Sequence, residues 1–249
     1  MIYNCTPPEK NKQNIDKDVE YHIKIIQNTH PEMIGIYDII EEKNRNGKPR
    51  PYEPREHMNT YNFAELLHTK IPEIPIIVYR SVKLGETYED IVGDIQNHQG
   101  MFPKVVIVGN SDNQQIHTNT LISKVLSECN VEVGCVLLPE RRNEMEICRE
   151  RIRSGVSFFI SQIVISSEYI RPFLEQLPVR IWTTIIPIEN EKTADMYNWL
   201  NGSNHAIDFS TYPNELVNAN IKEICFETIS YIHSARMIAS IERFRHKSI

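Results

Sequence analysis

Residues 104–109 read Lys-Val-Val-Ile-Val-Gly, a short run of β-branched residues that ends at a glycine. Consecutive apolar residues without polar alternation are typical of a parallel strand that is buried on both faces. A stretch of helical period follows at residues 118–129, and a second apolar run follows at 132–138. This strand–helix–strand order predicts one unit of a parallel β/α fold.

The same alternation continues from this unit toward both ends of the chain. The expected strands are residues 2–5, 33–40, 75–79, 104–109, 132–138, 157–162 and 179–186. The expected helices are residues 16–27, 59–68, 87–99, 118–129, 144–154, 167–176 and 192–200. Residues 41–56 are predicted to form a loop, because Pro49, Pro51 and Pro54 cannot all join regular backbone pairing.

The last part of the chain is harder to interpret. We expect a helix at 214–229, a strand at 231–234 and a final helix at 236–245, which would supply an eighth unit whose completeness the sequence leaves open. Eight units close a parallel sheet into a (β/α)8 TIM barrel, and the 249 residues match the usual length of about 250 for that fold. The sequence therefore predicts an α/β protein with one barrel domain over residues 1–249. An open, doubly wound sheet is the alternative.

Composition excludes several classes of function. The net charge of −6 argues against nucleic-acid binding, which depends on Lys and Arg side chains that neutralise phosphates. No apolar run reaches the roughly 18 residues of a membrane span, and the first residues lack the features of a signal peptide. The five cysteines are scattered and without a CxxC pair, as in reduced cytosolic proteins. We expect a cytoplasmic protein; a homo-oligomer is left open.

Reactive residues of a barrel lie at the carboxyl ends of its strands and in the loops that follow. The residues at these positions are Asn4, Cys5, Thr6, Asp38, Glu41, Glu42, Arg50, Arg55, Tyr79, Arg80, Gly109, Asn110, Asp112, Glu140, Arg141, Arg142, Gln162, Thr184, Pro187 and His233. Amides and arginines dominate this set, which favours recognition of a polar or anionic ligand. The sequence has no GxSxG, GxxxxGK[ST], HExxH or GxGxxG motif, and no metal site is expected.

Several stretches together resemble the methylenetetrahydrofolate reductase family. The most specific is Arg151-Ile-Arg-Ser-Gly-Val-Ser-Phe-Phe-Ile-Ser-Gln162, which resembles the family's K-V-D-A-G-A-x-F-x-I-T-Q. The weaker matches, in chain order, are Pro7-Pro8 to E-F-F-P-P-K, Val105–Asn110 to L-R-G-D, Leu138-Pro139-Glu140 to Y-P-E and Ile185-Ile186-Pro187 to I-L-P. Their order and spacing hold over most of the chain.

The resemblance implies a barrel that passes a hydride from NAD(P)H, through FAD, to a folate. It implies that Gln162 and Thr184 contact the folate and that Asn4, Asn110 and Gln162 form the catalytic set. It also implies a cofactor site at Gly109, Asp112, Glu140, Arg142 and Arg151.

The chain departs from the family at important positions. Asn4 replaces the general-acid Glu, Asn110 replaces an Asp beside pterin and flavin, and Arg142 replaces a His of the FAD loop. An amide cannot donate and recover a proton as a carboxylic acid does. The departures therefore argue for a reductase without tightly bound flavin. The alternatives are a non-catalytic folate- or nucleotide-binding barrel, and a barrel of unrelated chemistry such as a lyase or aldolase.

Overall fold

A computed structural model gives the fold of the chain. It describes residues 1–10, 15–39, 44–45, 48–51, 56–109, 115–185, 191–201, 216 and 221–227. Seven candidates from the sequence lie outside the described residues: Glu41, Glu42, Arg55, Asn110, Asp112, Pro187 and His233.

A closed barrel of parallel strands forms the centre of the molecule, as the sequence predicts. Around the barrel the strands follow the order β1-β10-β9-β8-β7-β6-β5-β2, and β2 pairs again with β1. The strands are β1 (Ile2–Cys5), β2 (Met33–Ile36), β5 (Ile76–Ser81), β6 (Lys104–Val108), β7 (Glu132–Leu137), β8 (Phe158–Ile163), β9 (Arg180–Ile185) and β10 (Ile224–Glu227). Closure excludes the open doubly wound sheet.

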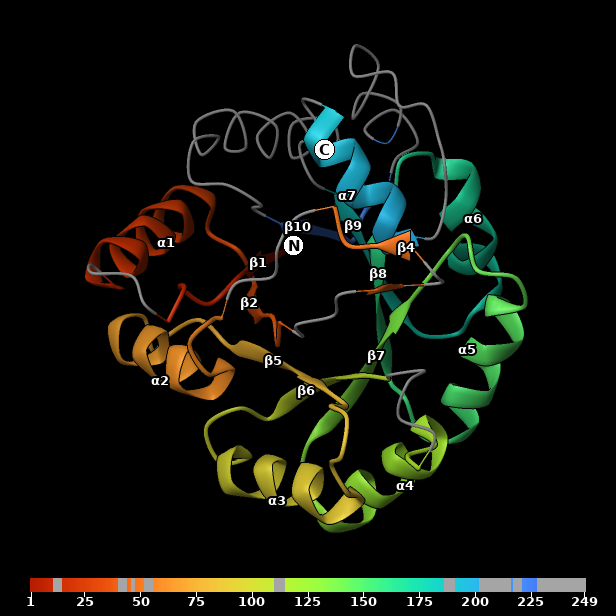
Figure 1. Cartoon of the computed structure of the whole chain (residues 1–249), viewed down its shortest axis with the longest axis horizontal. Helices are drawn as coiled ribbons and strands as arrows, with labels where there is room; N and C mark the ends of the chain where they lie inside the picture. Colours follow the sequence, from red (N-terminus) through yellow and green to blue (C-terminus); the bar gives the residue numbers. More distant parts are fainter. Residues whose placement is uncertain are drawn as a thin grey trace.

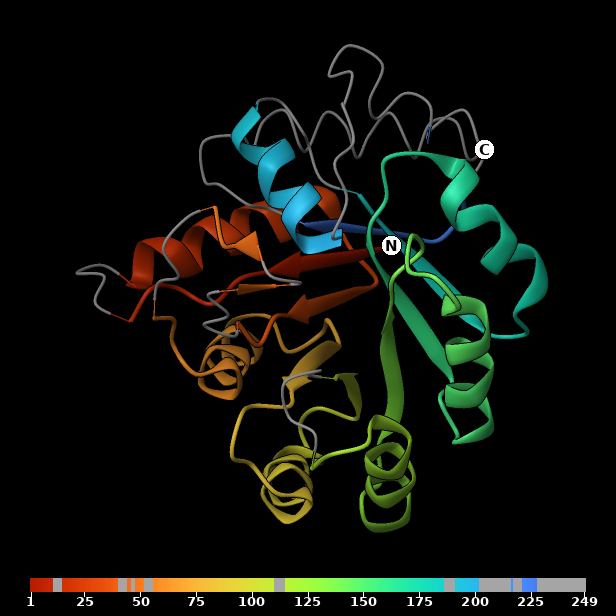
Figure 2. The same cartoon turned by 45° about the vertical axis from the view of Figure 1, so that its right-hand side comes forward.

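Helices surround the barrel and alternate with its strands along the chain (Figures 1 and 2). They are α1 (Ile15–Thr29), α2 (Thr60–Lys70), α3 (Tyr88–His98), α4 (Thr118–Glu128), α5 (Glu144–Arg153), α6 (Ser167–Gln176) and α7 (Glu191–Asn201). Local sequence fixes their starts: Thr87 and Asp90 form a capping box on α3, and Asn59 caps α2. Each lies within three residues of its expected bounds.

Side chains alternate between two apolar layers along each strand. The outer layer packs under the helices, and the inner layer fills the barrel. The inner layer consists of Ile2, Met33, Ile77, Tyr79, Val106, Phe158, Ile160, Trp182 and Cys225. Gly134 makes room in this layer, because a Cβ there would collide with the ring of Phe158.

Ion pairs close the end of the barrel where the strands begin. Glu32 contacts the Met1 amino group at 2.6 Å and Arg180 at 3.0 Å. Arg180 also pairs with Glu223 at 2.7 Å, and its guanidinium lies 4.3 Å from the ring centroid of Trp182. This closure leaves the other end, where the strands finish, as the place for a ligand.

The eighth strand corrects the sequence prediction. We expected a helix over 214–229, but residues 224–227 form β10, which closes the barrel between β1 and β9. The run Ile-Cys-Phe-Glu contains one β-branched and one aromatic residue, and its pairing with β1 and β9 outweighs the helical period around it. The strand and helix expected at 231–234 and 236–245 lie outside the described residues.

Two further boundaries differ from the prediction. β2 ends at Ile36 rather than at residue 40. Within the expected loop 41–56, β3 (Asn44–Arg45) and β4 (Lys48–Pro49) form a short antiparallel hairpin. Pro49 is tolerated there because a two-stranded ribbon leaves an edge at which a backbone N–H is not needed.

Gly134→Ala is expected to lower the free energy of unfolding by about 1–3 kcal/mol, because the buried ring of Phe158 cannot move aside. Gly93→Ala in α3 is the matched control, since nothing lies within 4 Å of its Cβ position. That change should raise stability by roughly 0.5–1 kcal/mol. Urea unfolding of both variants tests the packing, and equal midpoints would contradict it.

Candidate functional site

A cluster of polar side chains lies inside the barrel near the carboxyl ends of four neighbouring strands. We call it the mouth cluster; it consists of Asn4 of β1, Tyr37 after β2, Tyr79 of β5 and Glu227 of β10. The fully buried amide of Asn4 donates to the Tyr37 hydroxyl at 2.6 Å and to the Tyr79 hydroxyl at 2.9 Å. Both amide protons of Asn4 are therefore used within the cluster.

The carbonyl oxygen of Asn4 has a different environment. It is buried, and it accepts no hydrogen bond from the described part of the chain. It occupies the space beside Gly35, its register partner on β2, where any Cβ would overlap it. Gly35 is thus required for the position of this amide. A buried acceptor without a donor costs about 1–3 kcal/mol unless a ligand or water satisfies it.

Glu227 completes the cluster from the end of β10. The strand register places it level with Asn4, and alternation with the inward-facing Cys225 turns it into the barrel. Its Oε2 accepts a hydrogen bond from the Tyr37 hydroxyl at 3.0 Å. Burial raises the pKa of Glu227 to about 7, although the hydrogen bond from Tyr37 acts in the opposite direction.

The groups around Glu227 are neutral at physiological pH. Burial raises the pKa values of Tyr37, Tyr79 and Cys225 well above their ordinary values, and nearby Glu227 raises them further. None of the ion pairs between described residues involves Glu227. Its carboxyl group can therefore change protonation near neutral pH without a charged partner to hold it in one state.

Gln162 and Thr184 lie on the neighbouring strands β8 and β9. The register shifts between Ile160 and Ile163, so Ser161 and Gln162 both stand opposite Thr183. Such bulges redirect side chains and are common beside active sites. Thr184 is buried and donates through Oγ1 to the Ser161 carbonyl at 2.6 Å, which fixes the bulge. Gln162 remains half-buried, and its amide makes no hydrogen bond within the described chain.

Of the residues predicted to hold a cofactor, those that the structure describes do not gather around Asn4. Gly109 is exposed after β6, and a Cβ there would lie 2.6 Å from Thr118 Oγ1. Arg142 is exposed after β7, and Glu140 accepts a hydrogen bond from Tyr197 of α7. Arg151 is almost buried and donates to the Val136 carbonyl at 2.7 Å. These four residues lie near the carboxyl ends of β6 and β7, away from Asn4 on β1.

Two arginines proposed as anion ligands already have partners. Arg80 is buried on the outer side of β5 and pairs with Glu86 at 2.8 Å and with Asp94 at 2.7 Å. Arg141 pairs at 2.5 Å with the buried Glu144. Their charges are therefore balanced by neighbouring carboxylates, and they support the helices rather than an open anion site.

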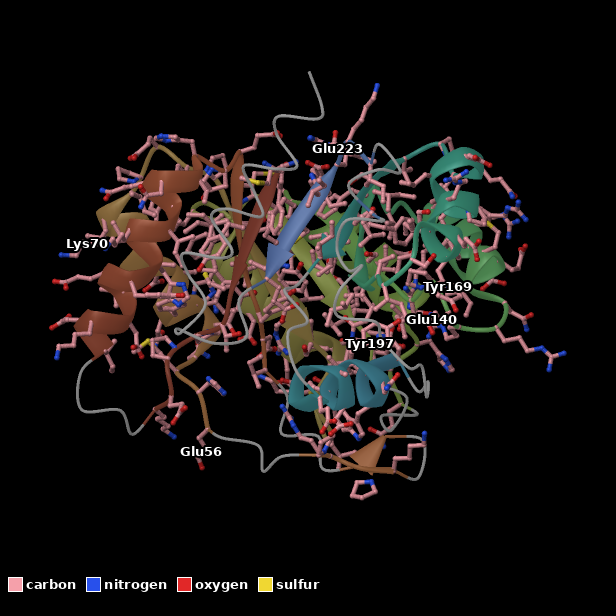
Figure 3. The ribbon with its side chains drawn as sticks, turned by 90° about the horizontal axis from the view of Figure 1, so that it is seen from above. Glu56, Lys70, Glu140, Tyr169, Tyr197 and Glu223 are labelled. Atoms are coloured by element: carbon pink, nitrogen blue, oxygen red, sulfur yellow. The ribbon has the colours of Figure 1, made fainter. Side chains whose placement is uncertain are left out.

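Helix α7 and the β3–β4 hairpin lie over the same end of the barrel (Figures 1 and 3). Trp199 of α7 donates through Nε1 to the Lys48 carbonyl at 3.1 Å, and the Arg50 guanidinium lies 5.4 Å from the Trp199 ring centroid. Figure 3 shows Tyr197 of α7 beside Glu140, with Glu223 at the opposite end of β10. Helix α7 and the hairpin thus contact each other at the end of the barrel where the strands finish.

A polar hollow of about 420 Å³ lies at the rim of this end of the barrel, between the start of α2 and the segment after β5. Its lining includes Lys10, Asp38, His57, Asn59 and Lys83. Lys83 pairs with Asp38 at 3.2 Å and Lys10 with Glu56 at 3.3 Å, so carboxylates balance both lysines.

Sequence reasoning identified Asn4 and Tyr79 but missed Tyr37 and Glu227. Tyr37 was missed because the sequence predicts a strand over residues 33–40, which puts Tyr37 within the strand. The strand in fact ends at Ile36, so Tyr37 directly follows it. Glu227 was hidden because its segment was interpreted as a helix. The run Ile224–Glu227 was the available signal, since a β-branched and aromatic run that ends in a carboxylate is typical of a barrel strand with a functional end.

Among the described residues, no group of three or more His, Cys, Asp or Glu side chains is arranged to hold a metal ion. In the same residues, no helix is long and apolar enough to cross a membrane.

Comparison with known proteins identifies the fold but no family. No protein-family model matches the chain, and no curated protein matches its sequence. A solved structure of a protein from Clostridium thermocellum, which binds two copies of 5-methyl-5,6,7,8-tetrahydrofolic acid, is similar with a TM-score of 0.74 and 20% identity. The similarity covers 99% of this chain and 94% of that one.

A second similar structure is 2,3-dimethylmalate lyase of the PEP mutase/isocitrate lyase superfamily. Its TM-score is 0.56 at 11% identity, and the similarity covers 100% of this chain and 84% of the lyase. At these identities both structures agree with the barrel fold and leave the function to be argued from the site.

Glu227→Gln is expected to change how stability depends on pH. Burial raises the pKa of Glu227 from 4.5 to about 7, so between these values the folded protein holds a proton that the unfolded chain has released. The free energy of unfolding of the wild type should therefore fall as pH rises through this window. At about pH 8 the variant should be more stable than the wild type by about 1–3 kcal/mol.

Urea unfolding at about pH 4.5 and about pH 8 measures this difference, which should vanish at the lower pH. Glu223→Gln is the control, because that residue forms a surface ion pair at the other end of β10. If Glu227→Gln followed the wild type across the whole window, the pKa of the Glu227 carboxyl group would not be raised.

Proposed function

We propose that this protein binds a reduced folate at the carboxyl end of the barrel, with the pterin ring against the mouth cluster. The observation that carries the proposal is the buried oxygen of Asn4, which lacks a donor in the described chain. A pterin presents ring and exocyclic N–H groups that would supply that donor. The rings of Tyr37 and Tyr79, whose centroids are 4.6 Å apart, give a flat heterocycle an aromatic wall.

Gln162 supports the same proposal from the opposite side of the mouth. Its half-buried amide offers a donor and an acceptor to a ligand ring, and the bulge of β8 gives it a position apart from the regular strand. The Clostridium thermocellum protein with a similar fold binds a methylated tetrahydrofolate, which makes this ligand class the first to test.

The reaction we propose is hydride transfer from NAD(P)H to a methylenetetrahydrofolate, without tightly bound flavin. Asn4, Asn110 and Gln162 would orient the folate, and Thr184 would shape its site through the bulge. Gly109, Asp112, Glu140, Arg142 and Arg151 are the proposed cofactor side of the mouth. Arg151 donates to the backbone carbonyl of Val136, so its proposed role is to support this side of the mouth. Arg142 is exposed, and its proposed role is to bind a phosphate of the cofactor.

A non-catalytic folate-binding barrel is the second candidate. It is favoured by Asn4, because the amide at this position holds the two tyrosines and cannot itself exchange a proton. The two candidates share the folate site and differ only in turnover.

Isothermal titration calorimetry with 5-methyltetrahydrofolate tests the folate site. The wild type should bind, and Gln162→Ala should bind about 3- to 10-fold more weakly, the loss of roughly one hydrogen bond. Folate turnover should fall in the same variant. Gln96→Ala on the exposed face of α3 is the matched control and should bind like the wild type. Absence of binding in the wild type would remove the proposal.

The visible absorption spectrum, before and after incubation with FAD, tests the cofactor. We expect no retained flavin band, together with NADH oxidation that depends on methylenetetrahydrofolate. A flavin band would instead indicate an ordinary flavin-dependent reductase. Folate binding without NADH oxidation would identify the non-catalytic binder.

A further inference from the structure

The mouth cluster contains a carboxyl group, whereas the catalytic set implied by the resemblance consists of the amides of Asn4, Asn110 and Gln162. Asn4 is fully buried and donates both of its amide protons to tyrosine hydroxyl groups. Glu227 lies level with it on the adjacent strand and accepts a hydrogen bond from Tyr37. The carboxyl group of Glu227 is therefore the register neighbour of Asn4, the position at which the resemblance implies a general acid.

Tyr37 connects this carboxyl group to the centre of the mouth. Its hydroxyl accepts from Asn4 at 2.6 Å and donates to Glu227 at 3.0 Å, so a continuous hydrogen-bonded path runs from β10 to β1. The groups facing Glu227 in the described chain are Asn4 from β1, Tyr37 after β2, Tyr79 from β5 and Cys225 of its own strand. All of these described groups are neutral near pH 7, so none of them is a cation that would hold the carboxyl group ionised.

We propose that Glu227 is the proton donor of the mouth cluster and that Tyr37 positions its carboxyl group toward a folate bound beside Asn4. The inference rests on the proposed function, because it names the acid for a folate held at that site. The inference also goes beyond the proposed function, because it assigns the acid to β10, the last described strand of the barrel, and not to β1.

The substrate of the proposed step is a 5,10-methylene-bridged tetrahydrofolate. The proton leaves the Glu227 carboxyl group for N10, and the bond between N10 and the bridging carbon breaks with its electron pair remaining on N10. The resulting iminium carbon, still bound to N5, accepts a hydride from a dihydronicotinamide, which is oxidised to the nicotinamide. Glu227 regains its proton from water after the methyl product leaves.

Near-ultraviolet absorbance of the tyrosines tests the carboxyl group without any ligand. Ionisation of Glu227 should perturb Tyr37, giving a difference spectrum that titrates near pH 7 in the wild type. Glu227→Gln and Tyr37→Phe should lose this titration, whereas Glu223→Gln, at the far end of β10, should keep it. Because other tyrosines contact histidines, as Tyr3 does with His22, the Glu227 signal is the part of the wild-type titration that is missing from Glu227→Gln. Identical titrations in the two proteins would overturn the proposal.

Turnover and binding then separate this inference from the proposed function. Glu227→Gln should bind 5-methyltetrahydrofolate within about threefold of the wild type, because the amide keeps similar size and hydrogen-bonding ability. Its NADH oxidation with methylenetetrahydrofolate should fall by about 10²–10⁴-fold, the usual contribution of a general acid. The wild-type rate should decline above about pH 7, and this inflection should be absent in the variant.

Tyr37→Phe should retain a smaller rate with a shifted inflection, as expected of a positioning residue, and Glu223→Gln should match the wild type. Failure of the wild type to bind folate would remove the proposed function. Folate binding with unchanged turnover in Glu227→Gln would overturn the role of Glu227 alone. Folate binding with no turnover in the wild type would overturn both that role and the proposed hydride transfer, and would leave the folate site.

Discussion

The parallel pairing of β1 with β10 is the interaction on which the rest of the structure depends. It joins the first and last described strands and turns an open sheet into a closed barrel. Its register sets Asn4 level with Glu227, while the pairing of β1 with β2 sets Asn4 level with Gly35. An amide, a carboxyl group and the space for the amide's oxygen thus meet at one level of the mouth, although they come from opposite ends of the sequence.

The two ends of the barrel handle polar groups in different ways. Where the strands begin, fixed charges neutralise one another, as between Arg180, Glu32 and Glu223. Where they finish, neutral hydroxyl and amide groups are bonded to each other, and one buried oxygen of Asn4 is left without a donor. Desolvating such a group costs free energy that folding alone does not recover. The unsatisfied oxygen of Asn4 is the reason for which we propose a ligand site at the second end.

The sequence was sufficient for the fold because strand and helix periods are local properties. The strand Lys104–Val108 and the capped helix Tyr88–His98 were predicted within about one residue at each end. The site was only partly predictable, since it depends on contacts between distant residues. Whether Ile224–Glu227 is a strand is decided by its pairing with β1, and Arg80 could be assigned to the outer layer only once Tyr79 was known to face inward.

The amide at Asn4 is consistent with an acid at Glu227 rather than with a simple loss of function. Two carboxyl groups at the same level of a buried mouth would repel each other when ionised, and their pKa values would be driven apart. With Asn4 in place, the amide donates to Tyr37, and Tyr37 donates to the carboxyl group. One titrating group then remains in a neutral surrounding, where burial raises the pKa of Glu227 to about 7. The amide on the first strand and the carboxyl group on the last strand are therefore parts of one arrangement.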